Sequence, residues 1–178
     1  MGSPPILTRL FAVASGGKPG VVRAKGPAMT TASEHRFPVS VHWLSGRLTN
    51  ATIDGKDDLL VATPPEFKGG IEGVWSPEDL FVAAVATCYT VTLVSITKRR
   101  SIPLRALEVR SSGDVTQRSD GRYGFVTVEL EVELETDAGF ETEAKGAALD
   151  AERSCLVAAS LDTPVHLTVN VRTAAAAA

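Results

Sequence analysis

The chain has 178 residues, of which 44% are hydrophobic and 22% charged, and its formal net charge is −3. This composition is that of a soluble protein of one domain with additional length at its ends. It argues against nucleic-acid binding, and two cysteines are too few for a small secreted disulfide scaffold.

The first 33 residues differ from the rest of the chain in charge. They carry four basic residues and no acidic one, whereas the remainder has 14 basic and 21 acidic residues. We interpret residues 1–35 as a flexible extension of a domain at 36–173, followed by a disordered alanine tail at 174–178. A transit peptide and a true start at Met29 are alternatives. The apolar piece of this extension is too short for a signal peptide, so we expect a cytoplasmic protein with reduced thiols.

Three short strands are predicted at the start of the domain by alternating apolar and polar residues, with one face of the first strand buried. The turns between them are Ser45-Gly46 and Asp54-Gly55, and the second of these is a strong hairpin signal. The strands bounded in this way lie at about 37–43, 47–53 and 59–62.

A long helix is predicted to follow. Ser76 is a good N-cap, Pro77 suits the first helical position, and Asp79 lies where a capping box places its acid. Basic residues near 98–100 favour the helix end. Apolar residues surround the helix almost completely, which predicts burial at the centre of the fold. The uncharged run 80–97 contains five serine and threonine residues and is too polar for a membrane span.

The second half of the domain is predicted to contain three more strands and a second helix. One strand, at 123–135, alternates apolar residues with glutamates. We interpret this acidic row as a solvated sheet face and a guard against edge-to-edge pairing. The element order is βββ-α-ββ-α-β, an α+β domain of mostly antiparallel strands with two long central helices. The remaining elements are predicted at about 104–116, 141–160 and 165–171.

Each of the two predicted helices carries one cysteine, Cys88 in the first and Cys155 in the second. A cysteine in an apolar helix is usually inert packing. If the two helices pack together, however, the thiols can meet. The two cysteines and three histidines show no metal-ligand spacing, so we expect no metal site.

The stretch 75–88 resembles the signature of the OsmC/Ohr family. That signature has Pro-Glu at a helix start, then Leu, an alanine-rich turn and a cysteine ten residues after the glutamate, here Pro77-Glu78 and Cys88. Cys155, followed by Ser160-Leu161 and a valine-rich strand, is similar to the second cysteine element of the family. The resemblance covers about residues 36–172.

Two departures point toward a third, less characterised OsmC-like group. Leu156 stands where peroxidases of the family often have proline, and the first helix starts Ser-Pro-Glu-Asp instead of Asn-Pro-Glu-Gln.

The resemblance implies a thiol-dependent peroxidase that reduces organic hydroperoxides. The Cys88 thiolate attacks the peroxide and becomes a sulfenic acid, and Cys155 condenses with it to a disulfide. A dithiol reductant, such as a lipoylated protein, then opens this disulfide. The resemblance also implies an intertwined homodimer with sites at the subunit interface, and neither a bound cofactor nor a membrane partner.

In the family, an arginine held by a glutamate lowers the pKa of the reacting thiol. Arg47, which follows Gly46 in the first hairpin, is the candidate arginine. Arg36 fits less well. The other interpretation of Arg47 is a solvated residue of the turn.

Glu78 is the candidate glutamate, but ten residues of straight helix place it about 15 Å from Cys88. It therefore reaches a thiol only through a kinked helix or in a second subunit.

The sequence is also compatible with two functions other than that of a peroxidase. The same fold could bind a small apolar ligand or sense oxidants without efficient turnover, or form a structural dimer with inert cysteines. Trp75, Phe67 and Tyr89 either line an apolar pocket or pack in the core. The serine-hydrolase elbow and the phosphate-binding loop are absent from the sequence.

Overall fold

The computed structural model describes residues 35–174, and the fold lies in the compact unit Pro38–Ala178. Several predictions fall outside the described residues, because they concern residues 1–34 and 175–178. These are the flexible extension, the transit peptide, the start at Met29 and the disordered tail.

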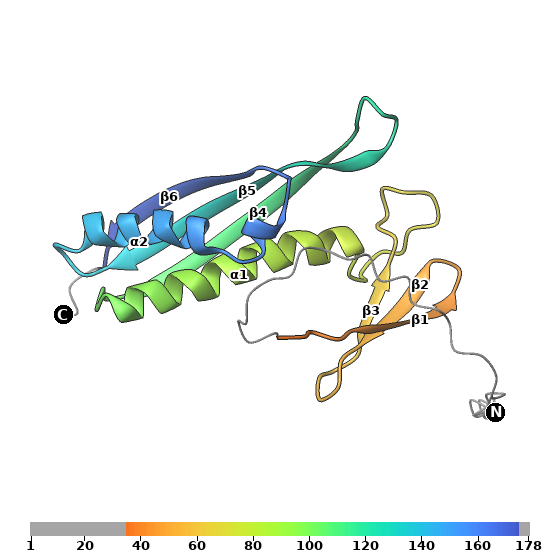
Figure 1. Ribbon diagram of the computed structural model, residues 1–178, viewed down its shortest axis with the longest axis horizontal. Helices are drawn as coiled ribbons and strands as arrows, with labels where there is room; N and C mark the ends of the chain where they lie inside the picture. Colours follow the sequence, from red (N-terminus) through yellow and green to blue (C-terminus); the bar gives the residue numbers. More distant parts are fainter. Residues whose placement is uncertain (1–34, 175–178) are drawn as a thin grey trace, which may run out of the picture. The chain divides into compact units, whose positions relative to one another are not determined.

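Two three-stranded sheets and two helices form an α+β fold (Figure 1). The elements are β1 (Ser40–Ser45), β2 (Leu48–Thr52), β3 (Leu59–Ala62), α1 (Pro77–Arg99), β4 (Ala106–Gln117), β5 (Tyr123–Thr136), α2 (Glu141–Ser154), the short 3-10 helix η1 (Ala158–Ser160) and β6 (Val165–Thr173).

The first sheet consists of β1, β2 and β3, each antiparallel to its neighbour. Both hairpins turn at a glycine with positive φ, 50° at Gly46 and 76° at Gly55, where a side chain would be strained. The prediction of one buried face on the first strand is wrong for the single chain, because all six β1 residues are exposed. Apolar side chains such as Val41 and Trp43 therefore have no cover within the described part of the chain.

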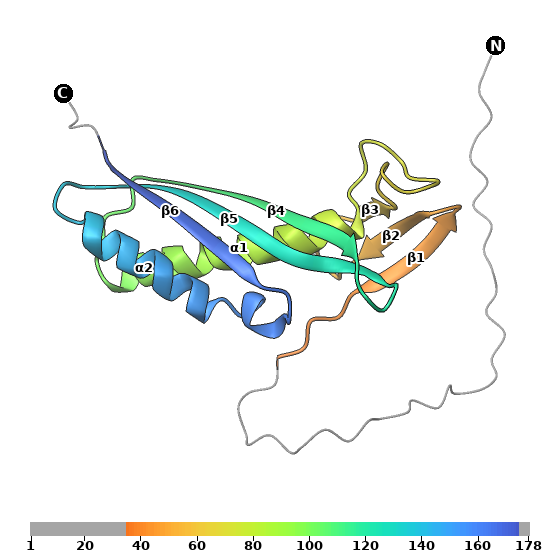
Figure 2. The same ribbon diagram turned by 90° about the horizontal axis from the view of Figure 1, so that it is seen from above.

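The second sheet has the order β4-β5-β6, with β4 antiparallel and β6 parallel to β5. Both helices pack on one face of this sheet, as the two views in Figures 1 and 2 show. Four apolar residues in the second half of β5 point toward the helices and are at most 1% exposed, whereas Val126, before them, is 39% exposed. They are Val128, Leu130, Val132 and Leu134.

The acidic row of β5 lies on the opposite face of this sheet. Its predicted role as an edge guard is wrong, because β5 is the central strand and has no free edge. Basic residues of the neighbouring strands approach it instead. Arg172 of β6 lies 2.9 Å from Glu133, and Arg110 of β4 lies 3.8 Å from Glu131. The row is part of a solvated face in which exposed ion pairs contribute little to stability.

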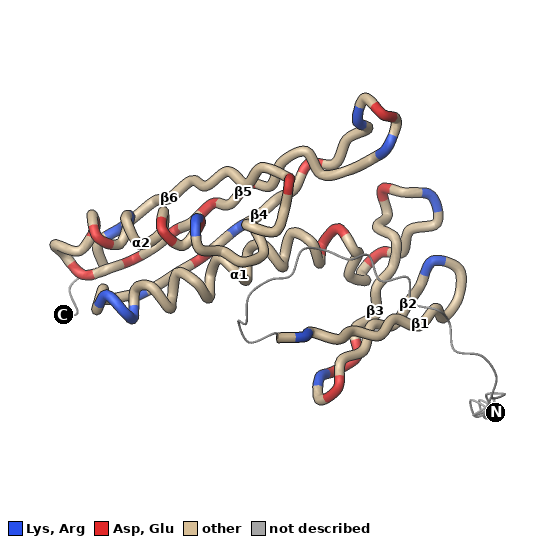
Figure 3. The backbone as a smooth tube through the Cα atoms, in the orientation of Figure 1, with Lys and Arg blue, Asp and Glu red and all other residues tan. Residues whose placement is uncertain are grey.

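The start of α1 is fixed by the predicted capping box. The Ser76 hydroxyl accepts a hydrogen bond from the Asp79 amide at 3.0 Å, and the Asp79 carboxylate accepts one from the Ser76 amide at 2.8 Å. Charged residues lie only at the two ends of this helix, acidic at its start and basic in its last turn (Figure 3). This distribution suits the helix dipole.

Only one side of α1 is buried, so the predicted burial at the centre of the fold is wrong for the single chain. Leu93 and its neighbours on that side contact α2 and β4, whereas Val91 is 61% and Val94 42% exposed. Among the described residues, α1 is the one helix whose length and mean hydropathy of 1.9 would allow it to span a membrane. Core helices of soluble proteins share these properties, and α1 carries the core contacts of such a helix.

The helix α2 is six residues shorter than predicted. Its inward side is a row of alanines that let α1 approach closely, and the Tyr89 hydroxyl donates to the Ala148 carbonyl at 3.2 Å. The helix ends because Cys155 has an extended backbone with ψ of 111°, while its amide donates to the Glu152 carbonyl. Cys155 is therefore the C-cap of α2 and does not lie inside the helix as predicted. The buried alanines are Ala144, Ala147, Ala148 and Ala151.

Candidate active site

The two cysteine thiols lie together where the middle of α1 meets the end of α2. Cys155 is 1% exposed and Cys88 is half-buried, and both are free thiols. The Cys155 thiol forms a hydrogen bond with the Cys88 sulfur. The packing of α1 on α2 thus brings together two cysteines that are far apart in the chain.

The surroundings shift the pKa values of the two thiols in opposite directions. Burial raises the pKa of Cys88, but hydrogen bonding from the Val157 amide, the Cys155 thiol and the Leu156 amide outweighs it, and the resulting pKa is below the ordinary value. Burial also raises the pKa of Cys155. The Ala158 amide opposes this, but the neighbouring Cys88 sulfur adds to it, and the resulting pKa is raised. The two directions favour the thiolate at Cys88 over the thiolate at Cys155.

The backbone amides that contact Cys88 were missed at the level of sequence. Leu156 and Val157 were placed inside a helix predicted to run to residue 160, where their amides would bond to carbonyls of the preceding turn. The early end of α2 frees them. Thr92, one turn after Cys88 in α1, donates its hydroxyl proton to the Cys88 carbonyl at 2.8 Å.

Arg47 and Glu78 line a different part of the molecule. Both border a cavity of about 450 Å³, together with aromatic residues including Phe67 and Tyr123. Neither cysteine lines this cavity, and no ion pair joins Arg47 to Glu78 in the described structure. One carboxylate oxygen of Glu78 is buried without a hydrogen-bond partner. The alternative arginine, Arg36, lies outside the compact unit.

The helix between Glu78 and Cys88 is continuous over Pro77–Arg99. The kink that would bring this carboxylate to the thiol of its own chain is therefore absent. Of the two ways in which Glu78 could act on a thiol, only the second subunit is left.

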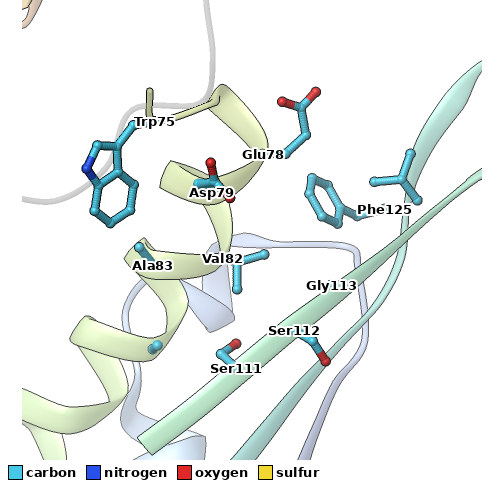
Figure 4. Close-up of a pocket in the computed structure, with 11 residues that line it drawn as sticks. Trp75, Glu78, Asp79, Val82, Ala83, Ser111, Ser112, Gly113 and Phe125 are labelled. Atoms are coloured by element: carbon cyan, nitrogen blue, oxygen red, sulfur yellow. The ribbon is translucent and has the colours of Figure 1, made fainter. Parts of the chain in front are cut away.

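A second cavity, of about 400 Å³, lies between the first turns of α1 and β4 (Figure 4). Trp75 and Phe125 border it, and its lining includes the small residues Ala83, Ser111 and Gly113. A Cβ atom on Gly113 would lie 2.7 Å from the Phe125 ring, so this position requires glycine.

The three aromatic residues considered as pocket residues have different places. Trp75 lines the cavity at the start of α1, and Phe67 lines the one that holds Arg47. Tyr89 is fully buried in the core and lines neither cavity, so of the two predicted alternatives it is the core-packing one that holds for Tyr89. Residues 35–174 contain no group of three or more side chains that could hold a metal ion.

Residues 70–170 match the model of the family described as OsmC-like protein, which is more than half of the chain. The chain belongs to the OsmC-like family. This OsmC-like protein is 27% identical over 139 residues to YmaD, an uncharacterized protein of Bacillus subtilis, a match that covers 76% of this chain and 92% of YmaD.

Two solved structures illustrate the shared fold. An OsmC-like protein of unknown function from Vibrio cholerae matches with a TM-score of 0.71 at 18% identity, covering 77% of this chain and all of the other. An organic hydroperoxide resistance protein OsmC from Legionella pneumophila matches with a TM-score of 0.61 at 23% identity. The match covers 77% of this chain and 96% of the Legionella protein. At these identities the likeness establishes the fold alone.

Proposed function

We propose that this OsmC-like protein is a cytoplasmic, thiol-dependent peroxidase that reduces organic hydroperoxides. The observation that carries the proposal is the pair of neighbouring thiols whose pKa values are shifted in opposite directions. A thiolate is the nucleophilic form of cysteine, so Cys88 is the attacking group. Cys155 stays protonated beside it and is the resolving group. The organic hydroperoxide resistance protein among the structural matches agrees with this choice of substrate.

The proposed cycle has three steps. The Cys88 thiolate attacks the terminal peroxide oxygen, the S–O bond forms, and the O–O bond breaks to release an alkoxide that takes up a proton as the alcohol. Cys155 then loses its proton and attacks the sulfur of the Cys88 sulfenic acid, which forms the disulfide and releases water. An external dithiol, such as a lipoyl group, reduces the disulfide by exchange and is itself oxidised.

The proposal includes a homodimer. Apolar side chains are exposed on two elements of the single chain, with Val41 and Trp43 of β1 at 62% and 72%, and Val91 of α1 at 61%. Apolar surface of this kind marks a protein–protein contact in a soluble protein. In a dimer, Arg47 and Glu78 would act at a site shared by the subunits, which accounts for their distance from the thiols of their own chain.

Replacing Val41 by aspartate is expected to weaken this dimer at least about a hundredfold, because an unpaired charge would be buried in the contact. Sedimentation velocity at several concentrations measures the change. His42→Asp is the matched control, since alternate residues of a strand face opposite sides. A parent protein that sediments as the 18.7 kDa monomer at all concentrations would contradict the dimer.

The proposed chemistry is tested by counting free thiols before and after addition of one equivalent of cumene hydroperoxide. We expect both thiols to disappear, and mass spectrometry to find the peptides of Cys88 and Cys155 joined by a disulfide. Unchanged thiols would contradict the peroxidase.

The two cavities that contain neither cysteine favour a second candidate function, binding of a small apolar ligand or sensing of oxidants without efficient turnover. Under this function, an apolar probe would occupy a cavity while the thiols stayed intact. Binding of such a probe without any loss of thiols would favour it over the peroxidase.

A further inference from the structure

The cavity between α1 and β4 follows the helix for about two turns. Its lining includes Glu78, Val82 and Ala86, which are four residues apart and therefore lie on one side of α1. Eight residues of helix separate the first from the last, a length of about 12 Å. On the opposite wall, Gly113 of β4 faces Val82, since a Cβ atom on this glycine would lie 2.9 Å from the valine.

Two buried polar atoms on this lining have no hydrogen-bond partner in the described structure. They are the Oε2 atom of Glu78 and the Oγ atom of Ser111. Figure 4 shows the Ser111 hydroxyl on the side of β4 that faces α1, at the opposite end of the drawn site from Glu78. Buried polar atoms in native proteins are almost always hydrogen-bonded, so two such atoms on one cavity point to a ligand with polar groups at both ends.

The rest of the lining determines which ligand fits. Between the two polar atoms, the walls are formed by apolar side chains that include Val82, Ala83 and Phe125. The described residues of this lining include no arginine, lysine or histidine. The Asp79 carboxylate is already used in the helix cap. An anionic group would therefore be buried beside acidic side chains without a cation, which is unfavourable.

We propose that Ser111 selects hydroperoxides whose organic group carries a second, uncharged oxygen. Glu78 is expected to act at a thiol of the second subunit, so the peroxide group lies at its end of the cavity. The apolar part of the substrate then passes Val82 and Phe125. The Ser111 hydroxyl donates a hydrogen bond to a hydroxyl or carbonyl oxygen at the far end. This assignment rests on the proposed function and names its substrate class, neutral oxygenated hydroperoxides.

The assignment is tested with octyl hydroperoxide and 8-hydroxyoctyl hydroperoxide, which differ by one hydroxyl group. In the parent, we expect kcat/KM to be higher for the hydroxylated substrate by about fivefold, the usual effect of one hydrogen bond. The difference should lie in KM, because the contact is remote from the reacting atoms. The ratio of the two kcat/KM values is the readout, since a loss of folded enzyme lowers both values and leaves the ratio unchanged.

In Ser111→Ala the preference for the hydroxylated substrate is expected to disappear. Ser112→Ala is the matched control, because the hydroxyl of this neighbouring residue points away from α1 (Figure 4) and the ratio should be kept. A ratio near one in the parent, or a preference that survives in Ser111→Ala, would overturn the inference. A higher kcat/KM for 8-hydroperoxyoctanoate, which ends in a carboxylate, than for the hydroxylated substrate would do the same.

A second measurement uses no peroxide. Octane-1,8-diol and octan-1-ol are titrated separately into the reduced full chain, and their dissociation constants are measured by calorimetry. We expect the diol to bind about fivefold more tightly in the parent, and this advantage to be lost in Ser111→Ala. Equal dissociation constants in the parent would overturn the inference.

The two measurements separate this inference from the proposed function. A protein that prefers the diol but consumes no hydroperoxide would support the Ser111 contact and refute the peroxidase. A protein that consumes both hydroperoxides without preference would support the peroxidase and refute the Ser111 contact.

Discussion

Cys88→Ser is expected to abolish the consumption of organic hydroperoxide. Removal of a covalent nucleophile lowers turnover by about a thousandfold or more, because a serine hydroxyl is a far weaker nucleophile than a thiolate. The Cys155 thiol cannot replace Cys88, because its pKa is raised and it is 1% exposed. The measurement is the loss of cumene hydroperoxide in the presence of excess dithiol, compared with the uncatalysed reaction.

Thr87→Ser is the matched control for this variant. Thr87 is the exposed neighbour of Cys88 in the same helix, so the change tests whether altering the helix surface alone reduces turnover. Circular dichroism is the check that both variants keep the fold. Turnover in a folded Cys88→Ser above about a tenth of the parent rate would show that Cys88 is not the attacking group.

Cys155→Ser is expected to react once with hydroperoxide and then stop. Without the resolving thiol, the Cys88 sulfenic acid cannot form the intramolecular disulfide, and excess peroxide oxidises it further to the sulfinic acid. Serine is preferable to alanine here, because its hydroxyl can still donate the hydrogen bond that Cys155 gives to Cys88. A burst of one equivalent and a dimedone adduct on Cys88 would be observed.

The steady turnover of Cys155→Ser depends on the reductant that is supplied. With a dithiol reductant, the variant is expected to fall well below the parent in steady turnover, because the exchange step has lost its disulfide substrate. Steady turnover equal to that of the parent would show that Cys155 does not resolve the sulfenic acid. Such a result would leave the assignment of Cys88 untouched.

The features that the sequence predicted well are those set by local chemistry. Ser76 and Asp79 form the capping box within four residues, and Asp54-Gly55 forms its hairpin because glycine adopts positive φ without strain. The alternation along β5 likewise reports directly on which side chains face the core. In each case, the determining contacts lie within a few residues of one another.

The end of α2 could not be predicted in the same way. The residues after Cys155 are Leu156, Val157 and two alanines, all compatible with a helix, and no glycine or proline marks a stop. The helix ends through the backbone conformation of Cys155, which depends on its packing near α1. The amides that contact Cys88 were missed for this reason.

The apolar surfaces of β1 and α1 posed a different difficulty. Apolar periodicity shows that a side chain is to be covered, but it does not show whether the cover belongs to the same chain. Val41 and Val91 were assigned to the interior on that pattern, and both are exposed in the single chain. The separation of Glu78 from Cys88, by contrast, followed from the helical rise alone and agrees with the uninterrupted α1.

The position of the two cysteines along the chain has a consequence for folding. The segment between them contains β4, β5 and most of the fold's central core. A disulfide between Cys88 and Cys155 would close this segment into a loop and reduce the conformational entropy of the unfolded chain. For a loop of this size, the effect is about 4 kcal/mol in a chain-entropy model. The oxidation state of the pair would thus set the resistance of the whole domain to unfolding and to proteases.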